Sequence, residues 1–159
     1  MAGENGNRAL FCDLVGTLVK FDENRELPLD AAGNVSIELL PGVAEKLAPI
    51  RDALICIVTN QAGIARGRLT LEKVEAAIAE VDRQLGGIVF GWQICPHQQS
   101  DVCECRKPKA GMIKELVSLY GIDLAASTMI GDQEIDAECA RIAGVGEFVY
   151  AKDFFASKQ

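Results

Sequence analysis

Residues 9–17 read Ala-Leu-Phe-Cys-Asp-Leu-Val-Gly-Thr, so an apolar run leads directly into Asp13 and then into a turn. Four more short and mostly apolar runs follow along the chain, at residues 53–58, 87–94, 127–130 and 147–150. Runs of this length and composition predict strands that are buried on both faces, as in a parallel sheet. The first of these predicted strands therefore delivers a carboxylate to its own C-terminal end.

Helical patterns lie between the predicted strands. After Thr70, which is a suitable N-cap, apolar residues recur at helical spacing until Gly86. A second apolar stripe runs up to Gly121, and Pro108 suits the first turn of its helix. Shorter helices are predicted near residues 42–50 and 134–143.

Strands that alternate with helices predict one α/β domain over residues 1–159. We expect a three-layer α/β/α, Rossmann-like fold with a mainly parallel central sheet. Residues 14–41 are rich in turn formers and charges and are expected to form an excursion from the sheet. No inserted segment is long enough for a separate cap domain. Residues 1–8 are polar and are expected to be flexible.

The composition excludes several classes of protein. The chain has 159 residues, of which 49% are hydrophobic and 25% charged, so wholesale disorder is excluded. No apolar run reaches the roughly 20 residues of a membrane span. The net charge of −7 argues against nucleic acid as a partner. The start shows no secretory signal, so a cytoplasmic location with reduced thiols is expected.

Polar residues follow three of the predicted strands at the point where each strand ends. They are Asp13, the stretch 59–61 (Thr-Asn-Gln) and Asp132. Ligands in open α/β sheets bind at the carboxyl ends of strands, so these groups are expected to meet at one edge. Two converging carboxylates repel one another unless a cation lies between them, which indicates a divalent ion such as Mg²⁺. The alternative is that each aspartate only caps the segment that follows it.

Other residues could support such a site. Asp136 lies one helical turn beyond Asp132, and Arg106 and Lys107 could meet a phosphate.

The order of these residues resembles the haloacid dehalogenase (HAD) superfamily. Asp13-Leu14-Val15-Gly16-Thr17 is similar to its motif I, Thr59-Asn60-Gln61 to motif II, Lys107 to the motif III lysine, and Gly131-Asp132 with Asp136 to motif IV. Three stretches resemble more narrowly subfamily IIIA, the branch of the heptose bisphosphate and histidinol-phosphate phosphatases. They are residues 59–67 (TNQAGIARG), 105–112 (CRKPKAGM) and 122–132 (IDLAASTMIGD).

The resemblance implies a phosphatase that acts on a small phosphorylated metabolite through an aspartyl-phosphate. Asp13 would be the nucleophile, and Thr59 and Lys107 would hold the phosphoryl oxygens. Mg²⁺ would bind Asp13, Asp132 and the backbone carbonyl of Val15, with Asp136 in support. Contacts to the substrate would come from four further side chains: Asn60, Gln61, Arg66 and Arg106.

A cluster of cysteines with the single histidine lies at residues 95–105. Cys95, His97, Cys103 and Cys105 supply three thiolates and one imidazole, which match a closed tetrahedral Zn²⁺ site. The resembling branch has the same loop directly before its Arg-Lys-Pro. A structural zinc would fix the loop that carries Arg106 and Lys107. The alternatives are free reduced thiols and a zinc ribbon for nucleic acid, which the acidic Asp101 and Glu104 disfavour.

Motif I departs from the family at Val15, where the second aspartate is expected. In the phosphatases that aspartate protonates the leaving oxygen and then activates water, and valine can do neither. Three hypotheses follow: a phosphatase that is impaired or specialised, an inactive protein that binds a phosphometabolite or a protein partner, and a zinc-stabilised interaction module.

Overall fold

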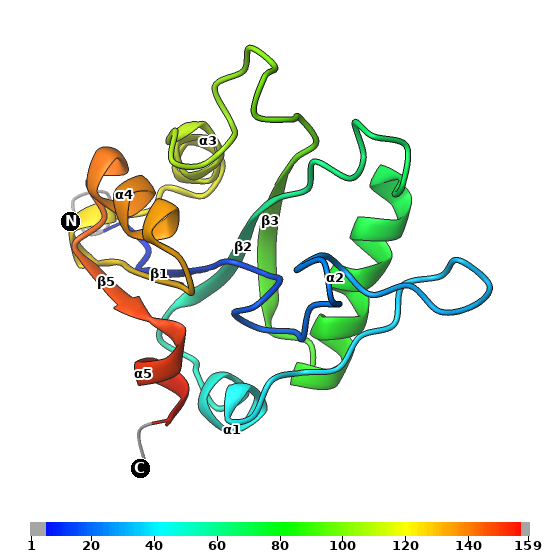
Figure 1. The fold of residues 1–159 in the computed structure, drawn as a ribbon. Helices are drawn as coiled ribbons and strands as arrows, with labels where there is room; N and C mark the ends of the chain where they lie inside the picture. Colours follow the sequence, from blue (N-terminus) through cyan, green and yellow to red (C-terminus); the bar gives the residue numbers. More distant parts are fainter. Residues whose placement is uncertain (1–5, 157–159) are drawn as a thin grey trace.

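The computed structural model describes residues 6–156. Five parallel strands form its sheet in the order β3-β2-β1-β4-β5 (Figure 1). Their bounds are β1 Ala9–Cys12, β2 Leu54–Asn60, β3 Val89–Cys95, β4 Thr128–Gly131 and β5 Glu147–Tyr150. The helices are α1 Val43–Leu47, α2 Leu71–Leu85, α3 Gly111–Tyr120, α4 Glu134–Ala143 and α5 Ala151–Ala156, with a 3₁₀ turn at Leu124–Ala126. The predicted parallel α/β fold is confirmed.

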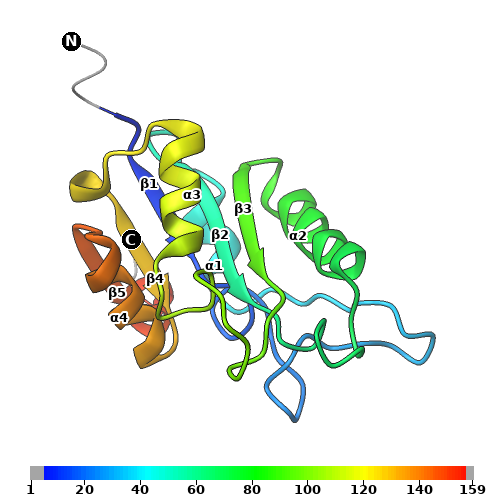
Figure 2. The same cartoon turned by 90° about the horizontal axis from the view of Figure 1, so that it is seen from above.

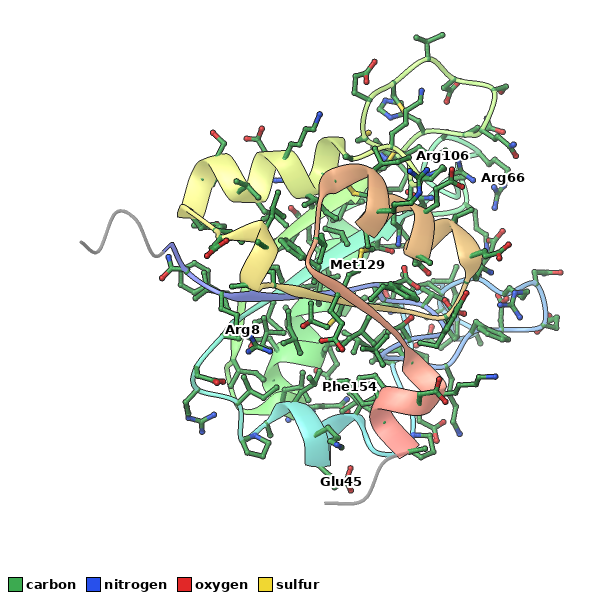
Figure 3. All side chains as sticks on the ribbon, turned by 90° about the vertical axis from the view of Figure 1, so that its left-hand side faces the viewer. Arg8, Glu45, Arg66, Arg106, Met129 and Phe154 are labelled. Carbon is green, nitrogen blue, oxygen red and sulfur yellow. The ribbon has the colours of Figure 1, made fainter. Side chains whose placement is uncertain are left out.

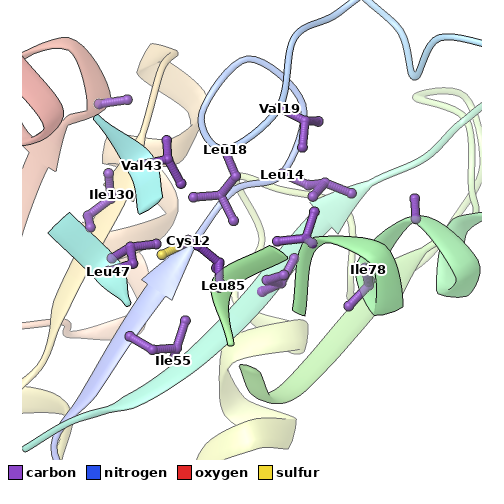
Figure 4. Packing of buried hydrophobic residues seen from close by; sticks show 14 of the residues in the cluster. Cys12, Leu14, Leu18, Val19, Val43, Leu47, Ile55, Ile78, Leu85 and Ile130 are labelled. Carbon is purple, nitrogen blue, oxygen red and sulfur yellow. The ribbon is translucent and has the colours of Figure 1, made fainter. Parts of the chain in front are cut away.

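Alternation along β1 divides the core into two layers. Leu10 and Cys12 face a cluster that includes residues of α1, α2 and α5, part of which Figure 4 shows. Ala9 and Phe11 face the opposite cluster, which packs against α3 and α4. Because successive side chains of a strand point to opposite faces, one four-residue strand serves both layers. Figure 2 shows the same helices flanking the sheet from a second direction.

Two predictions about the elements were wrong. The strands β3 and β5 are the edges of the sheet and are only partly buried, so burial on both faces holds for β1 and β4 and for the middle of β2. The helix α3 begins at Gly111, and Pro108 lies in the turn before it, after a cis peptide bond with Lys107. An apolar run does not reveal whether its strand lies at an edge of the sheet, because strand order depends on pairing between distant segments.

The excursion at residues 14–41 carries no strand or helix and crosses over the α2 side of the sheet. It is tied together by isolated bridges between Val15 and Val19, Val19 and Leu39, and Leu29 and Val35. Its apolar residues complete the first core cluster rather than a core of their own: Leu14, Leu18, Val19 and Leu27 are fully buried there.

The N-terminal segment is anchored from Asn7 onward. The backbone N–H of Asn7 donates to Gly121 at 2.9 Å, and Asn7 accepts from Asp123 at 2.8 Å. Residues 1–5 of the stretch expected to be flexible lie outside the described residues. None of the helices within residues 6–156 has the length and apolar character needed to cross a bilayer.

The three cysteines outside the cluster are buried in the core. Cys12 lies in the first core cluster, and Cys56 and Cys139 lie in the second. Burial raises the pKa of the Cys56 thiol to about 12 and that of Cys139 to about 11, so both stay neutral at physiological pH. They act as small apolar side chains.

The cap of α2 gives a direct test of one sequence signal. The hydroxyl of Thr70 accepts a hydrogen bond from the backbone N–H of Lys73 at 3.1 Å. Thr70→Ala should lower the free energy of unfolding by about 1 kcal/mol, measured by urea denaturation. Thr70→Ser keeps the hydroxyl and should retain most of the stability. Equal losses in the two variants would contradict the role of the cap.

Candidate active site at the carboxyl ends of the strands

Three strands deliver polar groups to one small cavity. Asp13 follows β1, Thr59 lies near the end of β2, and Asp132 follows β4, and all three line a cavity of about 110 Å³ together with Lys107. A carboxylate oxygen from each of Asp13, Asp132 and Asp136 lies within 4.8 Å of the others. The structure therefore brings these side chains together, as expected.

Lys107 lies at the centre of this group with its side chain 2% exposed. Its ammonium contacts an oxygen of Asp13 at 2.7 Å and an oxygen of Asp136 at 2.7 Å, and donates to the carbonyl of Val58 at 3.0 Å. Burial alone would lower the pKa of Lys107, but the two carboxylates outweigh burial and raise it. Lys107 therefore keeps its positive charge, and its three N–H groups already have protein partners.

The pKa values of the two carboxyl groups that contact Lys107 are also raised, which for an acid disfavours the charged form. Burial raises the pKa of Asp13 above its usual value, and the nearby Asp132 carboxylate adds to the rise, while Lys107 opposes it. Burial also raises the pKa of Asp136, and the negative charge of Asp13 contributes. The carboxylates of Asp13 and Asp136 bring two negative charges close together where little water can screen them, so a further cation would stabilise them.

Asp136 is held by the start of α4. One of its oxygens accepts from Lys107, and the other accepts from the backbone N–H of Gln133 at 3.1 Å, in a capping box. Both oxygens are thus already engaged with protein groups. By contrast, the contacts that Asp132 receives from Thr17 and Arg25 are longer, at 3.4 Å each.

Asn60 fixes the main chain at Lys107. Its side-chain oxygen accepts from the Lys107 N–H at 2.9 Å, and its amide donates to the Lys107 carbonyl at 3.3 Å. The neighbouring Gln61 is 5% exposed and donates to the Thr59 hydroxyl at 2.9 Å. Asn60 lines both polar cavities and Gln61 lines the outer one, so their expected contact with a substrate stays a prediction.

Sequence reasoning missed the role of Thr17. Its hydroxyl donates to Asp13 at 3.1 Å and lies 3.4 Å from Asp132, so it joins the two carboxylates. Gly16 precedes it with a φ of 87°, and a Cβ there would collide with the Asp132 carboxylate. The Gly-Thr pair in motif I was the available signal, because only glycine suits this backbone and this close approach.

Arg25 was also missed, because it comes from the excursion far from the motifs. Its guanidinium lies 3.4 Å from Asp132 and stacks over the ring of Phe21 at 4.3 Å. No sequence signal pointed to Arg25, since its position depends on how a turn folds back over the sheet.

Val15 lines the same cavity with a half-buried side chain. Within the described residues, no protein group donates to its backbone carbonyl. The carbonyl oxygen therefore remains free to bind a cation, while the side chain offers no proton.

An outer cavity of about 270 Å³ adjoins the first one. Arg25, Arg66 and Arg106 line it together with Val15. Figure 3 shows Arg66 and Arg106 near each other at one end of the molecule. Arg66 forms an ion pair with Glu26, and Arg106 donates to the carbonyl of His97 at 3.1 Å. The structure thus brings the two predicted substrate arginines together.

A third and larger cavity of about 620 Å³ lies on the other side of Asp132. It is lined by residues such as Leu40, Pro41 and Phe155, and among the described residues Lys152 is the one basic residue in its lining. An apolar lining with a single cation suits a phosphate group poorly, so the two polar cavities are the better candidates for the active site.

The Cys/His cluster has the donors and the spacing of a tetrahedral metal site. The Nδ1 atom of His97 lies 3.4 Å from the sulfur of Cys95 and 3.3 Å from that of Cys105. The sulfurs of Cys95 and Cys103 are 4.0 Å apart, and those of Cys95 and Cys105 are 2.9 Å apart. A tetrahedron with usual Zn–S and Zn–N bonds has edges of about 3.5–3.8 Å. The four ligands therefore fit one ion with small adjustments.

Comparison with known proteins gives a consistent result. The HAD-hydrolase-like family model matches residues 104–158. The D-glycero-beta-D-manno-heptose-1,7-bisphosphate 7-phosphatase of Haemophilus ducreyi is 33% identical over 152 residues, which cover 88% of this chain and 80% of that protein. The enzyme of the same name from Pseudomonas aeruginosa is 38% identical over 64% of this chain. That match spans 60% of the relative, less than two thirds of its length.

A solved structure resembles the fold over most of the chain. It is the D,D-heptose 1,7-bisphosphate phosphatase of Bordetella bronchiseptica in complex with magnesium and phosphate. The TM-score is 0.77 with 28% sequence identity, over 88% of this chain and 78% of the other.

The buried ion pairs predict a large effect of removing their cation. Lys107→Met should lower the free energy of unfolding by about 3–5 kcal/mol, because it leaves two buried carboxylates without the cation that pairs with both. Lys114→Met, at an exposed position of α3, is the matched control and should change stability by less than about 0.5 kcal/mol. Urea denaturation measures both. A Lys107→Met protein as stable as the control would show that the charges are not buried as described.

Proposed function

Because the chain belongs to the HAD family of phosphoric monoester hydrolases, we propose that it is a Mg²⁺-dependent phosphatase of a small phosphorylated metabolite. A sugar phosphate such as heptose 1,7-bisphosphate, or histidinol phosphate, is the class of substrate that its relatives and motifs favour. The observation that carries the proposal is the buried Lys107 between Asp13 and Asp136, next to Thr59 and Asp132 at the cavity.

In this proposal Asp13 attacks phosphorus, the bond to the leaving oxygen breaks, and an aspartyl-phosphate forms. Water then releases the phosphate and restores the carboxylate. Thr59 can donate its hydroxyl to a phosphoryl oxygen. Lys107 contributes mainly through its charge, because its three N–H groups are already bonded to protein. A fixed charge beside the cavity favours the negative charge that shifts during transfer.

Magnesium fits the oxygens at the cavity. The carboxylates of Asp13 and Asp132 and the free carbonyl of Val15 are hard ligands, as Mg²⁺ prefers. When bound there, the ion would offset the repulsion between the Asp13 carboxylate and the phosphate. Asp136 belongs to the same cluster of three aspartates and would support the site by holding Lys107.

Zinc fits the Cys/His cluster, since three sulfurs and one ring nitrogen close a tetrahedron and leave no position for water. A zinc bound by Cys95, His97, Cys103 and Cys105 would be structural. It would fix the segment that continues into Arg106 and Lys107. Reduced thiols are needed for it, so the cytoplasm is the compartment we propose.

Val15 favours a second candidate function. Without a carboxylic acid at this position no side chain there can protonate the leaving group, so the chain could bind a phosphometabolite or a protein partner without turnover. Enzymatic release of phosphate from any ester distinguishes the two candidates.

The zinc hypothesis predicts one ion per chain. Elemental analysis of protein purified without chelator should find it, and Cys103→Ser should lower both the zinc content and the melting temperature, because binding of the metal contributes to folding. Cys139→Ser alters a buried thiol outside the cluster and should retain the zinc. Protein that contains no zinc would contradict the hypothesis.

The magnesium hypothesis is tested by calorimetric titration of Mg²⁺. Asp132→Asn should weaken binding by about tenfold or more, because it removes one of the hard anionic ligands. Lys114→Met should bind as the wild type does. Equal affinities in wild type and Asp132→Asn would remove Asp132 from the site.

Because Val15 stands where the general acid is expected, we predict slow hydrolysis of alkyl phosphates. Val15→Asp should raise the rate of phosphate release from sugar phosphates by about 10²-fold or more, because general acid–base help is worth about 10²–10⁴. Asp13→Asn should abolish release in either background. If Val15→Asp folds and binds Mg²⁺ but releases no phosphate from any ester of the panel, the binding function is preferred.

A further inference from the structure

Arg25 and Val15 meet where the two polar cavities join. Five residues line both cavities: Val15, Arg25, Asn60, Gln133 and Ile135. The inner cavity holds Asp13 and Thr59, and the outer one holds Arg66 and Arg106. If the phosphoryl group of a substrate binds next to Asp13, its leaving group would therefore lie at this junction. Arg25 is the one basic residue among the five.

The turn that carries Arg25 is rigidly held in an uncommon conformation. Arg25 has a φ of 61°, the left-handed region that few residues other than glycine adopt. Asp22 stabilises the turn, since one carboxylate oxygen accepts from the N–H groups of Asn24 and Glu26 at 2.8 and 3.0 Å. Arg68 holds Asp22 at 3.0 Å and the carbonyl of Leu27 at 2.8 Å. Strained backbone persists where the surroundings over-determine it. The Arg25 side chain itself is 55% exposed, and its guanidinium lies at the junction against the Phe21 ring at 4.3 Å and Asp132 at 3.4 Å.

We propose that Arg25 contacts the leaving oxygen of the substrate and stabilises its negative charge, in place of the proton that Val15 cannot give. This inference rests on the phosphoryl transfer of the proposed function and changes the substrate class that the relatives favour. The preferred substrates become mixed anhydrides of phosphoric acid with an acidic leaving group, such as acyl phosphates, and sugar phosphates become the slow substrates.

Both the formation and the hydrolysis of the aspartyl-phosphate can proceed without a general acid. Asp13 forms a bond to phosphorus, and the leaving carboxylate departs with the electron pair of the broken P–O bond. An arginine does not give up a proton, but its N–H groups can donate hydrogen bonds to that anion. Water then attacks phosphorus and Asp13 departs as a carboxylate. Both protons of the water remain on the product, which leaves as dihydrogen phosphate.

The test compares three probes with leaving groups of rising pKa: acetyl phosphate, p-nitrophenyl phosphate and glycerol 1-phosphate. The variant is Arg25→Asn, because asparagine tolerates the left-handed backbone at this position. It should lower kcat/KM for p-nitrophenyl phosphate by about 10²-fold, the usual cost of one donor to an oxyanion, and for acetyl phosphate by less, because acetate is the weaker base. In the Val15→Asp background, which supplies the proton, the same change should cost less for glycerol 1-phosphate. Arg83→Asn, on the exposed face of α2, controls for the loss of a surface charge.

The rates for the three probes distinguish a failure of the Arg25 role from a failure of the phosphatase function. A wild type that hydrolyses the probes while Arg25→Asn loses nothing, or loses the same factor for every probe, would overturn the role of Arg25 alone. A wild type that hydrolyses none of the probes would overturn the proposed function itself. A second substitution, Arg25→Lys, keeps a charge without the guanidinium fork and should recover part of the rate for p-nitrophenyl phosphate.

Discussion

The ammonium of Lys107 lies between two buried carboxylates, and the site depends on this arrangement. Asp13 comes from the end of β1 and Asp136 from the first turn of α4, so one side chain ties together two segments that are far apart in sequence. Burying such charges costs several kcal/mol each unless the geometry pairs them well. The contacts of 2.7 Å meet that condition. The sheet and α4 must therefore be placed accurately for the charges to be tolerated at all.

Neighbouring parts of the chain hold Lys107 in place. Asn60 bonds to its main chain on both sides, which links the loop after β2 to the loop before α3. The Cys/His cluster precedes it by only a few residues, and a metal bound there would constrain the same loop. A Lys107 that moved away would leave Asp13 and Asp136 without their cation.

The strands and the main site residues could be predicted because their signals are local. An apolar run that ends in Asp13, or in Gly131-Asp132, marks both a strand and its functional end. The order of the strands, the edge positions of β3 and β5, and the location of Arg25 depend on contacts between distant segments, and no local pattern encodes them. Asn60 and Gln61 were predicted at the site from their place after β2, but their hydrogen-bond partners depend on the loop before α3 and on Thr59 and became clear only from the structure. Val15 was visible as a departure in the motif, but its free carbonyl and its place between the two cavities required coordinates.

In the proposed phosphatase Asp13 is a nucleophile held beside a fixed positive charge. Intact-mass spectrometry of the protein after brief incubation with acetyl phosphate and Mg²⁺, followed by acid quench, would detect the phosphorylated form. We expect a phosphoryl adduct that peptide mapping assigns to Asp13 and that accumulates because Val15 cannot activate the attacking water. An unmodified protein under conditions where phosphate is released, or an adduct on another residue, would show that Asp13 is not the nucleophile.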